Sequence, residues 1–157
     1  MALVPGNLAT QLENGWMVAE GGSYPQNPLQ SGQRFAAAVS TWFSAAQANG
    51  FPCATAKARE GQLAAQAAAA FQVMSAPAAG AQLALAVAAY YAGQSFGAGV
   101  ATYPAAVSAG TATFSQVFAD LNSPIAARAQ QMASACQIMA VSTIVTFPLP
   151  LTPSPIM

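Results

Sequence analysis

The side chains best suited to acid–base chemistry are few in this chain and lie far apart. Its 157 residues include four acidic residues, four basic residues and no histidine. General acid–base and nucleophilic catalysis need a group that titrates near neutral pH, usually histidine, or carboxylates brought together. We interpret the four separated carboxylates as capping or solubilising groups: Glu13, Glu20, Glu60 and Asp120. The sequence therefore predicts a protein that is not an enzyme.

Metal, cofactor and phosphate sites also lack their usual residues. Cys53 and Cys136 have neither CxxC spacing nor histidine partners, so zinc and iron–sulfur sites fail on ligand count. We expect small buried hydrophobic residues at both positions, with a disulfide between them as the alternative. The segment Gly97-Ala-Gly99 is not followed by the Lys-Ser/Thr of a phosphate-binding loop. We predict no cofactor, no metal and no small-molecule substrate.

Charge is scarce along the whole chain. Only 5% of residues are charged, the net charge is zero, and residues 61–119 contain no Asp, Glu, Lys, Arg or His, whereas about a quarter of the residues in an ordinary globular domain are charged. The basic residues are too scattered to neutralise a row of phosphates: Arg34, Lys57, Arg59 and Arg128. This predicts no nucleic-acid binding and a surface that other protein subunits cover, since charge repulsion would not keep copies apart. Asp120 with Arg128, and Glu60 with Lys57 or Arg59, are expected to form surface ion pairs.

The elements that must position these residues repeat along the chain. Segments 33–42, 81–90 and 130–139 superimpose at a spacing of about 48 residues, each with apolar residues at i, i+4 and i+7. This pattern predicts three long helices that bury one face. Before each of them a capping side chain stands close to a proline, as expected at a helix start: Asn27-Pro28, Ser75-Ala-Pro77 and Ser123-Pro124.

Shorter apolar stripes lie between the long helices, over residues 60–74 and 114–121, and another lies before the first of them, over residues 8–16. The sequence therefore predicts an all-α fold of about six helices in three αα repeats of roughly 48 residues. Residues 141–147 are β-branched and partly alternating, which predicts a short strand at the end. We expect one helical domain over residues 1–147 and a Pro-rich, extended C-terminal arm over residues 148–157, because prolines exclude a regular helix there.

Two groups of apolar residues are candidates for contacts with other subunits. The adjacent aromatic pairs Trp42-Phe43 and Tyr90-Tyr91 occupy corresponding points of two repeats, where they fill the core or, in part, anchor an interface. The uncharged arm either lies on a partner or folds back over its own helices. Its candidate contact residues are Leu149, Leu151 and Ile156.

Export and membrane insertion are not favoured. The N-terminal residues have no basic region followed by an apolar one, so we expect a protein made and used without Sec export. The most apolar stretches, residues 78–92 and 132–147, rely on alanine and contain Gln82 or Gln137, which is unlike a transmembrane helix. A membrane-associated helical protein remains an alternative to the structural one, as does a soluble helical carrier of an apolar ligand.

The combination resembles the small, Ala-rich helical structural proteins of tailed bacteriophage virions. The resemblance is carried by helices whose stripes end in Trp42 or Tyr90, by the loop Gly97-Ala-Gly-Val-Ala-Thr-Tyr-Pro104, and by the closing helix that runs into a β-branched strand. It implies a late, non-enzymatic virion part in the head, neck, tail or baseplate, assembled in the host cytoplasm. Its expected partners are copies of itself and other virion proteins.

Overall fold

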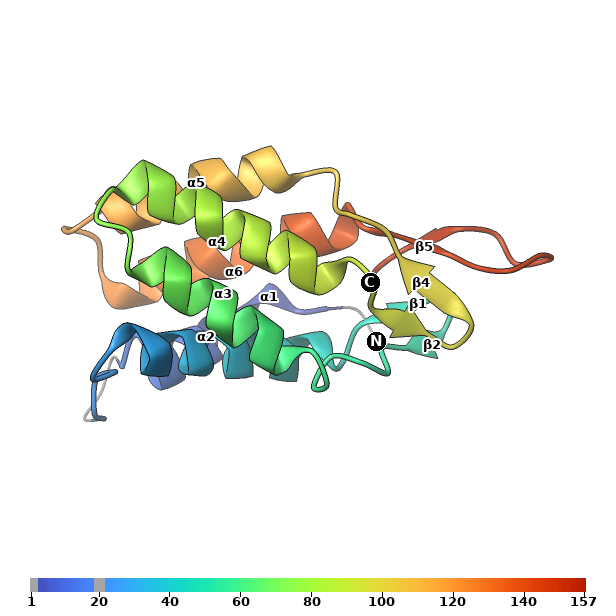
Figure 1. Cartoon of the computed structure of the whole chain (residues 1–157), viewed down its shortest axis with the longest axis horizontal. Helices are drawn as coiled ribbons and strands as arrows, with labels where there is room; N and C mark the ends of the chain where they lie inside the picture. Colours follow the sequence, from blue (N-terminus) through green and yellow to red (C-terminus); the bar gives the residue numbers. More distant parts are fainter. Residues whose placement is uncertain (1–2, 19–21) are drawn as a thin grey trace.

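The computed structural model describes residues 3–18 and 22–157, so the predicted role of Glu20 lies outside it. Across these residues the chain is mostly helical, with six α helices in which a shorter helix precedes each longer one (Figure 1). The elements are α1 (Pro5–Gln11), extended by the π-helical turn η1 (Leu12–Trp16), α2 (Pro28–Phe43), α3 (Glu60–Phe71), α4 (Ala76–Tyr91), α5 (Val107–Ala119) and α6 (Ile125–Val141). The mostly helical prediction is confirmed.

The starts of the long helices follow from local sequence. Asn27 is extended and its side-chain oxygen accepts a hydrogen bond of 2.8 Å from the Gln30 amide, while Pro28 occupies the first helical position. This arrangement satisfies one free amide of the first turn and removes another. Ser75 also precedes its helix in an extended conformation, but it makes no side-chain cap bond. The predicted cap is therefore confirmed at Asn27 and wrong at Ser75. It is also wrong at Ser123, because Pro124 occupies the N-cap position of α6 and no side-chain cap bond is made there.

Each long helix is followed by a short β-hairpin, which corrects the all-α prediction of a single strand. The strands pair antiparallel as β1 (Gln47–Ala48) with β2 (Phe51–Pro52), β3 (Ser95–Phe96) with β4 (Gly99–Ala101), and β5 (Ile144–Thr146) with β6 (Ser154–Pro155). β4 also pairs with β5, so that two sheets form instead of one strand. The expected strand over residues 141–147 is shorter than predicted because Val141 completes the last turn of α6.

Backbone hydrogen bonds join the three hairpins into a closed ring. The first hairpin meets the second where the Ala54 amide donates to the Ser95 carbonyl (2.8 Å), and the second meets the third through β4 and β5. The third returns to the first, since Met157 and Gln47 exchange two hydrogen bonds of 2.9 Å. Because the ring closes, none of these very short strands needs to be stable as an isolated hairpin.

The ring has approximate threefold symmetry that matches the helix repeat. Equivalent bonds close the base of each hairpin, where Cys53, Ala101 and Ile156 donate to the carbonyls of the residues that follow the three long helices, at 2.9, 2.9 and 3.1 Å. The inward-facing residues of the first strands are fully buried: Ala48, Phe96 and Val145. The hairpins lie together at one end of the helices (Figure 1).

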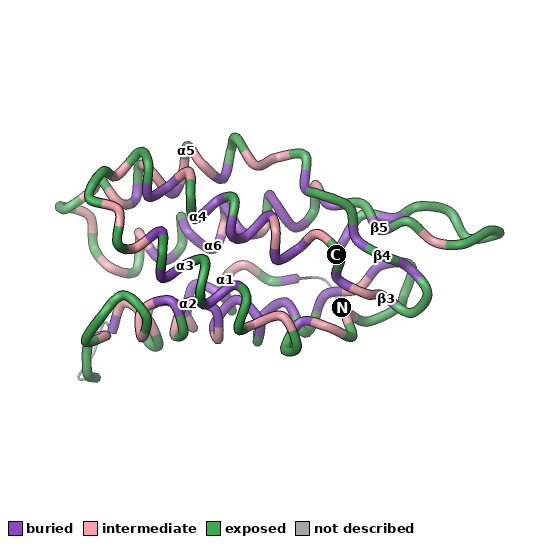
Figure 2. Tube along the Cα trace, in the orientation of Figure 1, coloured by how far each residue is buried: buried purple, intermediate pink, exposed green. Residues whose placement is uncertain are grey.

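The helices pack around a core that the same symmetry organises. Phe35, Leu83 and Met132, one from each long helix, are fully buried, and the buried positions run along the inner sides of the helices (Figure 2). Gly32 and Gly80 occupy equivalent positions where helices approach closely, since an added Cβ would lie 2.4 Å from the Ala64 carbonyl oxygen and 2.4 Å from the Ser115 amide nitrogen. Small residues at these two crossings let α2 pack on α3 and α4 on α5.

Candidate functional site

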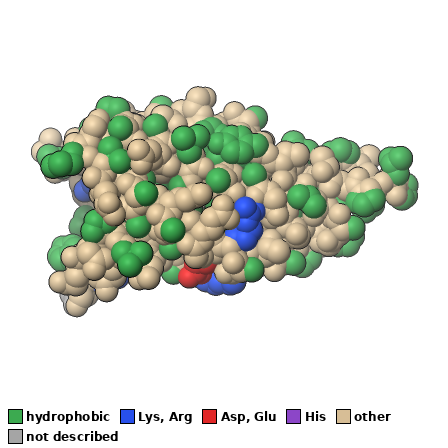
Figure 3. All heavy atoms as spheres, in the orientation of Figure 1, with side chains coloured by type: hydrophobic (Ala, Val, Ile, Leu, Met, Phe, Trp, Pro, Cys, Tyr) green, Lys and Arg blue, Asp and Glu red, His purple; other side chains and the backbone are tan. Residues whose placement is uncertain are grey.

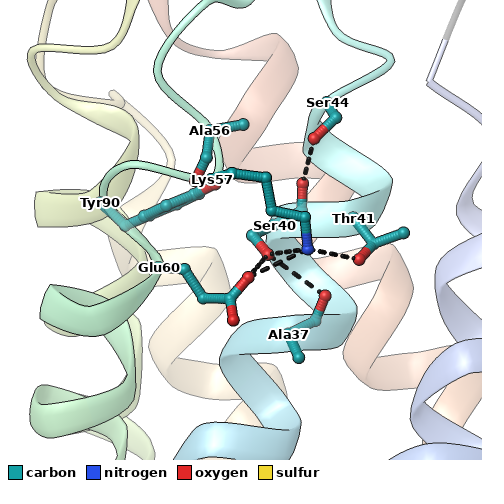
Figure 4. A network of polar contacts seen from close by, with 8 residues as sticks. All are labelled: Ala37, Ser40, Thr41, Ser44, Ala56, Lys57, Glu60 and Tyr90. Atoms are coloured by element: carbon teal, nitrogen blue, oxygen red, sulfur yellow. Dashed lines mark hydrogen bonds and ion pairs between the residues drawn. The ribbon is translucent and has the colours of Figure 1, made fainter.

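The charged residues nearest to a catalytic arrangement surround Ser40 on α2 (Figure 4). The Lys57 ammonium donates to Ser40 Oγ at 2.9 Å and to Thr41 Oγ1 at 2.7 Å, and it forms an ion pair of 3.0 Å with Glu60. Ser40 also donates a hydrogen bond to the Glu60 carboxylate. The ion pair predicted between Lys57 and Glu60 is confirmed.

This cluster ties α2 to the start of α3, and its hydrogen bonds do not suit nucleophilic chemistry. Burial works to raise the pKa of Glu60, but hydrogen bonds from Ser40 and Lys57 and the Lys57 charge outweigh it, so the pKa lies below its ordinary value. The Lys57 side chain donates to Ser40 Oγ and pairs with Glu60, so it is a hydrogen-bond donor to the serine and not the general base that a serine nucleophile needs. Ser40 is moreover fully buried. We interpret the cluster as structural.

The other predicted titratable positions have structural surroundings as well. Hydrogen bonds from the Ser123 side chain and from the amides of Ser123 and Asn122 lower the pKa of Asp120. The two amide bonds, both of 3.0 Å, shape the turn before α6. It makes no ion pair with Arg128, so that predicted pair is wrong. Both cysteines are free. Cys136 is buried as predicted, and burial raises its thiol pKa to about 12. Cys53 is only half-buried, so the same prediction is wrong there.

The four aromatic residues weighed as interface anchors lie in the core of the chain. Trp42 is 3% exposed, and Phe43, Tyr90 and Tyr91 are fully buried, with the Phe43 and Tyr91 rings stacked at 4.7 Å. Trp42 Nε1 donates to the Val4 carbonyl at 3.0 Å, and the Tyr90 hydroxyl donates to the Ala56 carbonyl at 2.8 Å. Each bond fastens a long helix to the segment before its own short helix. Of the two roles considered for these four residues, core packing and interface contact, the structure shows core packing.

The proline-rich C-terminus divides into a buried end and an exposed loop. Ile156 is fully buried in the ring and Met157 pairs with Gln47, so the last residues fold back onto their own chain. The preceding residues 147–153, which we call the Pro–Leu loop, connect β5 to β6 and project from the hairpin end (Figure 1). Leu149 is 94% exposed and Leu151 is 40% exposed. Of the three candidate contact residues in the arm, these two are accessible.

The opposite end of the molecule is hollowed. Trp16, Phe71 and Phe118, from the ends of η1, α3 and α5, form an aromatic triad in which Phe71 lies 5.1 Å from Trp16 and 6.1 Å from Phe118 between ring centroids. Two cavities of about 630 and 420 Å³ adjoin this triad and share Phe71 and Phe118. Both volumes fall in the range of roughly 300–1,000 Å³ found for ligand pockets.

Equivalent positions of the long helices complete this hollow. Ser31, Ala79 and Arg128 each lie three residues after the start of their helix, and all three line the cavities. Together with the aromatic triad they form what we call the mouth: Trp16, Ser31, Phe71, Ala79, Phe118 and Arg128. Trp16 Nε1 donates to Ser31 Oγ at 2.7 Å. Arg128 Nε is buried and has no partner among the described residues, which leaves one donor for a ligand.

Sequence reasoning did not find the mouth. Its members come from all three repeats, and each one alone has the spacing of an ordinary core residue. The only signal was the repeat itself, because positions that are equivalent in a closed threefold ring must meet near its axis. Exposed apolar residues stand beside the mouth: Tyr24 is 63% exposed, Met74 fully exposed and Leu121 84% exposed.

The described residues hold no group of three or more metal-ligating side chains. Within the same part of the chain, no helix combines the length and apolarity that crossing a bilayer requires. The chain matches no protein-family model, no curated protein and no solved structure.

Proposed function

We propose that this protein is a non-enzymatic structural component of a tailed-phage virion, in the head, neck, tail or baseplate, and that it acts by oligomeric packing. The observation that carries the proposal is the position of its exposed apolar residues. The four most exposed of them lie at the two ends, with Leu149 in the Pro–Leu loop and Tyr24, Met74 and Leu121 beside the mouth. Smaller exposed apolar areas lie on the long helices, at Leu29, Leu85 and Ile138. Exposed apolar ends favour contacts with other proteins.

The charge distribution supports the same function. Residues 35–56, 61–119 and 129–157 carry no charged side chain. All of α4, α5 and the hairpin ring therefore contain amides and hydroxyls but no charged side chain. On the face shown in Figure 3, the charged atoms form small groups in a surface that is otherwise neutral. A neutral surface loses little when it is desolvated, whereas burying an unpaired charge costs several kcal/mol.

The rigidity of the closed ring suits a building block. Three hairpins and three helix pairs close on themselves, so the chain needs no partner to complete its own core. Its contacts with neighbours are then made by preformed surfaces, and preformed surfaces limit the entropy lost on association.

The proposal is tested on the particles of the phage that encodes the chain. Density-purified virions, washed with high salt, are expected to contain the protein at a constant ratio to the major structural proteins by quantitative mass spectrometry. Static light scattering on the purified full chain is expected to give a mass above that of one 15.8 kDa chain. Absence from washed particles would contradict the virion role.

The mouth supports one second candidate, a carrier of an apolar ligand, because its aromatic triad lines a cavity of about 630 Å³. Extraction of the purified protein with organic solvent, followed by mass spectrometry, tests this function. A stoichiometric apolar molecule in the extract would favour the carrier over the structural protein.

A further inference from the structure

We propose that the Pro–Leu loop of one copy inserts into the mouth of a second copy, so that the protein associates head to tail. This inference rests on the proposed packing function and names the two surfaces that would carry it. The loop and the mouth lie at opposite ends of the longest axis (Figure 1). A loop therefore cannot reach the mouth of its own chain, and its occupant must come from another molecule.

The shapes of the two surfaces are complementary. The loop projects beyond the ring and presents Leu149, which is almost fully exposed, between two prolines. In each of the first two hairpins only two residues connect the strands. The seven residues of the Pro–Leu loop are therefore more than a hairpin turn needs. The mouth is a concave site with an aromatic floor. Residues 148–151 form a turn in which the Leu151 amide donates to the Pro148 carbonyl at 3.2 Å. The loop therefore presents Leu149 on a preformed shape, which limits the entropy lost on binding.

The polar groups are complementary too. Pro148, Pro150 and Pro153 have no amide donors, so the loop offers mainly carbonyl acceptors, and the carbonyls of Leu149 and Leu151 accept no hydrogen bond from the described residues. The mouth offers the opposite, since Arg128 Nε is a buried donor without a partner in the described structure. A loop carbonyl would satisfy this donor, whose unpaired state otherwise carries a desolvation cost.

Charge does not oppose this contact. The Pro–Leu loop has no charged residue, and among residues 3–18 and 22–157 Arg128 is the one charged side chain that lines the two mouth cavities. A contact between two different surfaces is heterologous, and it continues from copy to copy until the rotation closes a ring or a filament grows. The structure thus gives the protein a directed mode of self-association along its long axis.

Two variants separate the partners of this contact. Leu149→Ser with Leu151→Ser removes the apolar side chains of the loop, and Tyr24→Asp with Met74→Asp puts charge beside the mouth at exposed positions that the fold does not need. Leu85→Asp, at a half-exposed position on the side of α4, is the matched control for added charge. Light scattering is expected to show assembly in the wild type and in the control, and monomers in each double variant.

Mixing the two double variants gives the decisive measurement. The charged-mouth variant still has an intact loop, and the serine variant still has an intact mouth, so an equimolar mixture is expected to form dimers that grow no further. A capped peptide covering residues 146–154 is expected to bind the wild type and change Trp16 fluorescence, with at least tenfold weaker binding to the charged-mouth variant.

Each other outcome overturns the inference without deciding the proposed function. If both double variants assemble like the wild type, the protein packs through other surfaces. If the peptide does not bind and the mixture stays monomeric, the loop does not enter the mouth, and only the particle measurement then judges the virion role. If the peptide leaves the protein unaffected while an apolar molecule is extracted from it, the mouth belongs to that ligand.

Discussion

The second and third hairpins share their base and differ at their tip. At the base, Ala101 donates to the Gln94 carbonyl at 2.9 Å and Ile156 donates to the Thr143 carbonyl at 3.1 Å, in equivalent positions of the ring. At the tip, two residues turn the second hairpin, whereas the third carries the seven-residue Pro–Leu loop. The shared base is what folding requires. Within the third tip, Phe147 packs against Phe51 and the Thr152 carbonyl accepts a hydrogen bond of 2.7 Å from Asn49, whereas the Leu149 side chain is 94% exposed.

The largest effect that this comparison predicts separates two apolar residues in the third hairpin. Ile156→Ala is expected to lower the free energy of unfolding by about 2–5 kcal/mol, because the side chain is fully buried and its loss leaves a cavity where the ring closes. Leu149→Ala removes a similar side chain that is 94% exposed and is expected to change stability by less than about 0.5 kcal/mol. Urea denaturation of both variants measures the difference.

Equal losses in these two variants would break the comparison. They would mean that the Pro–Leu loop stabilises the fold as much as the closing strand does. The loop would then need no partner to explain its apolar residues.

A smaller effect is expected at the two hairpin bases. Gln94 is fully buried, accepts from Thr55 Oγ1 at 2.6 Å and donates to the Tyr90 carbonyl at 2.9 Å. Gln94→Leu is expected to cost about 1–3 kcal/mol, because both partners lose a buried hydrogen bond. In the third hairpin Thr143 makes a single side-chain bond, of 2.9 Å to the Met139 carbonyl. Thr143→Val should therefore lower the free energy of unfolding by less than Gln94→Leu does, as measured by thermal denaturation. A larger loss in Thr143→Val would contradict the stabilising role of the Gln94 hydrogen bonds.

The tip of the second hairpin is expected to be conformationally demanding. Gly97 has φ of +59°, and an added Cβ would lie 2.7 Å from the Phe51 ring. Gly97→Ala should lower stability by about 1–2 kcal/mol from the left-handed backbone alone. Gly61→Ala is the control, since no neighbour lies within 4 Å of its added Cβ in α3, and it should stabilise the helix by about 0.5–1 kcal/mol. Chemical denaturation that gave both variants the same sign would contradict this account of the turn.

The sequence was sufficient for the helices and insufficient for the hairpins. Apolar stripes that end at Trp42 and Tyr90 have a clear helical period, and the structure places helices there. Strands of two or three residues are too short to show alternation. The dipeptide Asn49-Gly50, with φ of +50° and +80°, is the usual signature of a tight hairpin turn and was the one local signal for the first hairpin.

A similarity between two Phe-Pro steps in the sequence also gives no indication of the hairpin ring. The steps Phe51-Pro52 and Phe147-Pro148 look like equivalent exits from two long helices, yet Phe51 lies in the second strand of its hairpin and Phe147 follows the first strand of another. Their rings nevertheless meet at 5.8 Å between centroids. Such a contact depends on ring closure, which is a tertiary property that no local pattern in the sequence carries.

The smallest predicted effect concerns acid and the base of the first hairpin. The segment that follows the first hairpin contains Lys57 and Glu60, which form the one ion pair among the described residues. The third hairpin has no charged residue. Because the pKa of Glu60 is lower in the folded chain, the stability it contributes is present above its unfolded pKa and is lost as the pH falls through the folded pKa. The side chain is 31% exposed, so solvent limits the loss to about 0–1 kcal/mol.

Urea midpoints measured from pH 6 down to pH 3 test this difference between the hairpins. The wild type is expected to lose slightly more stability across that range than Glu60→Gln, which has no carboxylate to protonate at that position. Leu149→Ala should follow the wild type, because the Pro–Leu loop has no titrating group. A pH dependence unchanged in Glu60→Gln would show that the Ser40 hydroxyl and Lys57 hold α2 to α3 without the help of the charge on Glu60, and would leave the first and third hairpin bases alike in their response to acid.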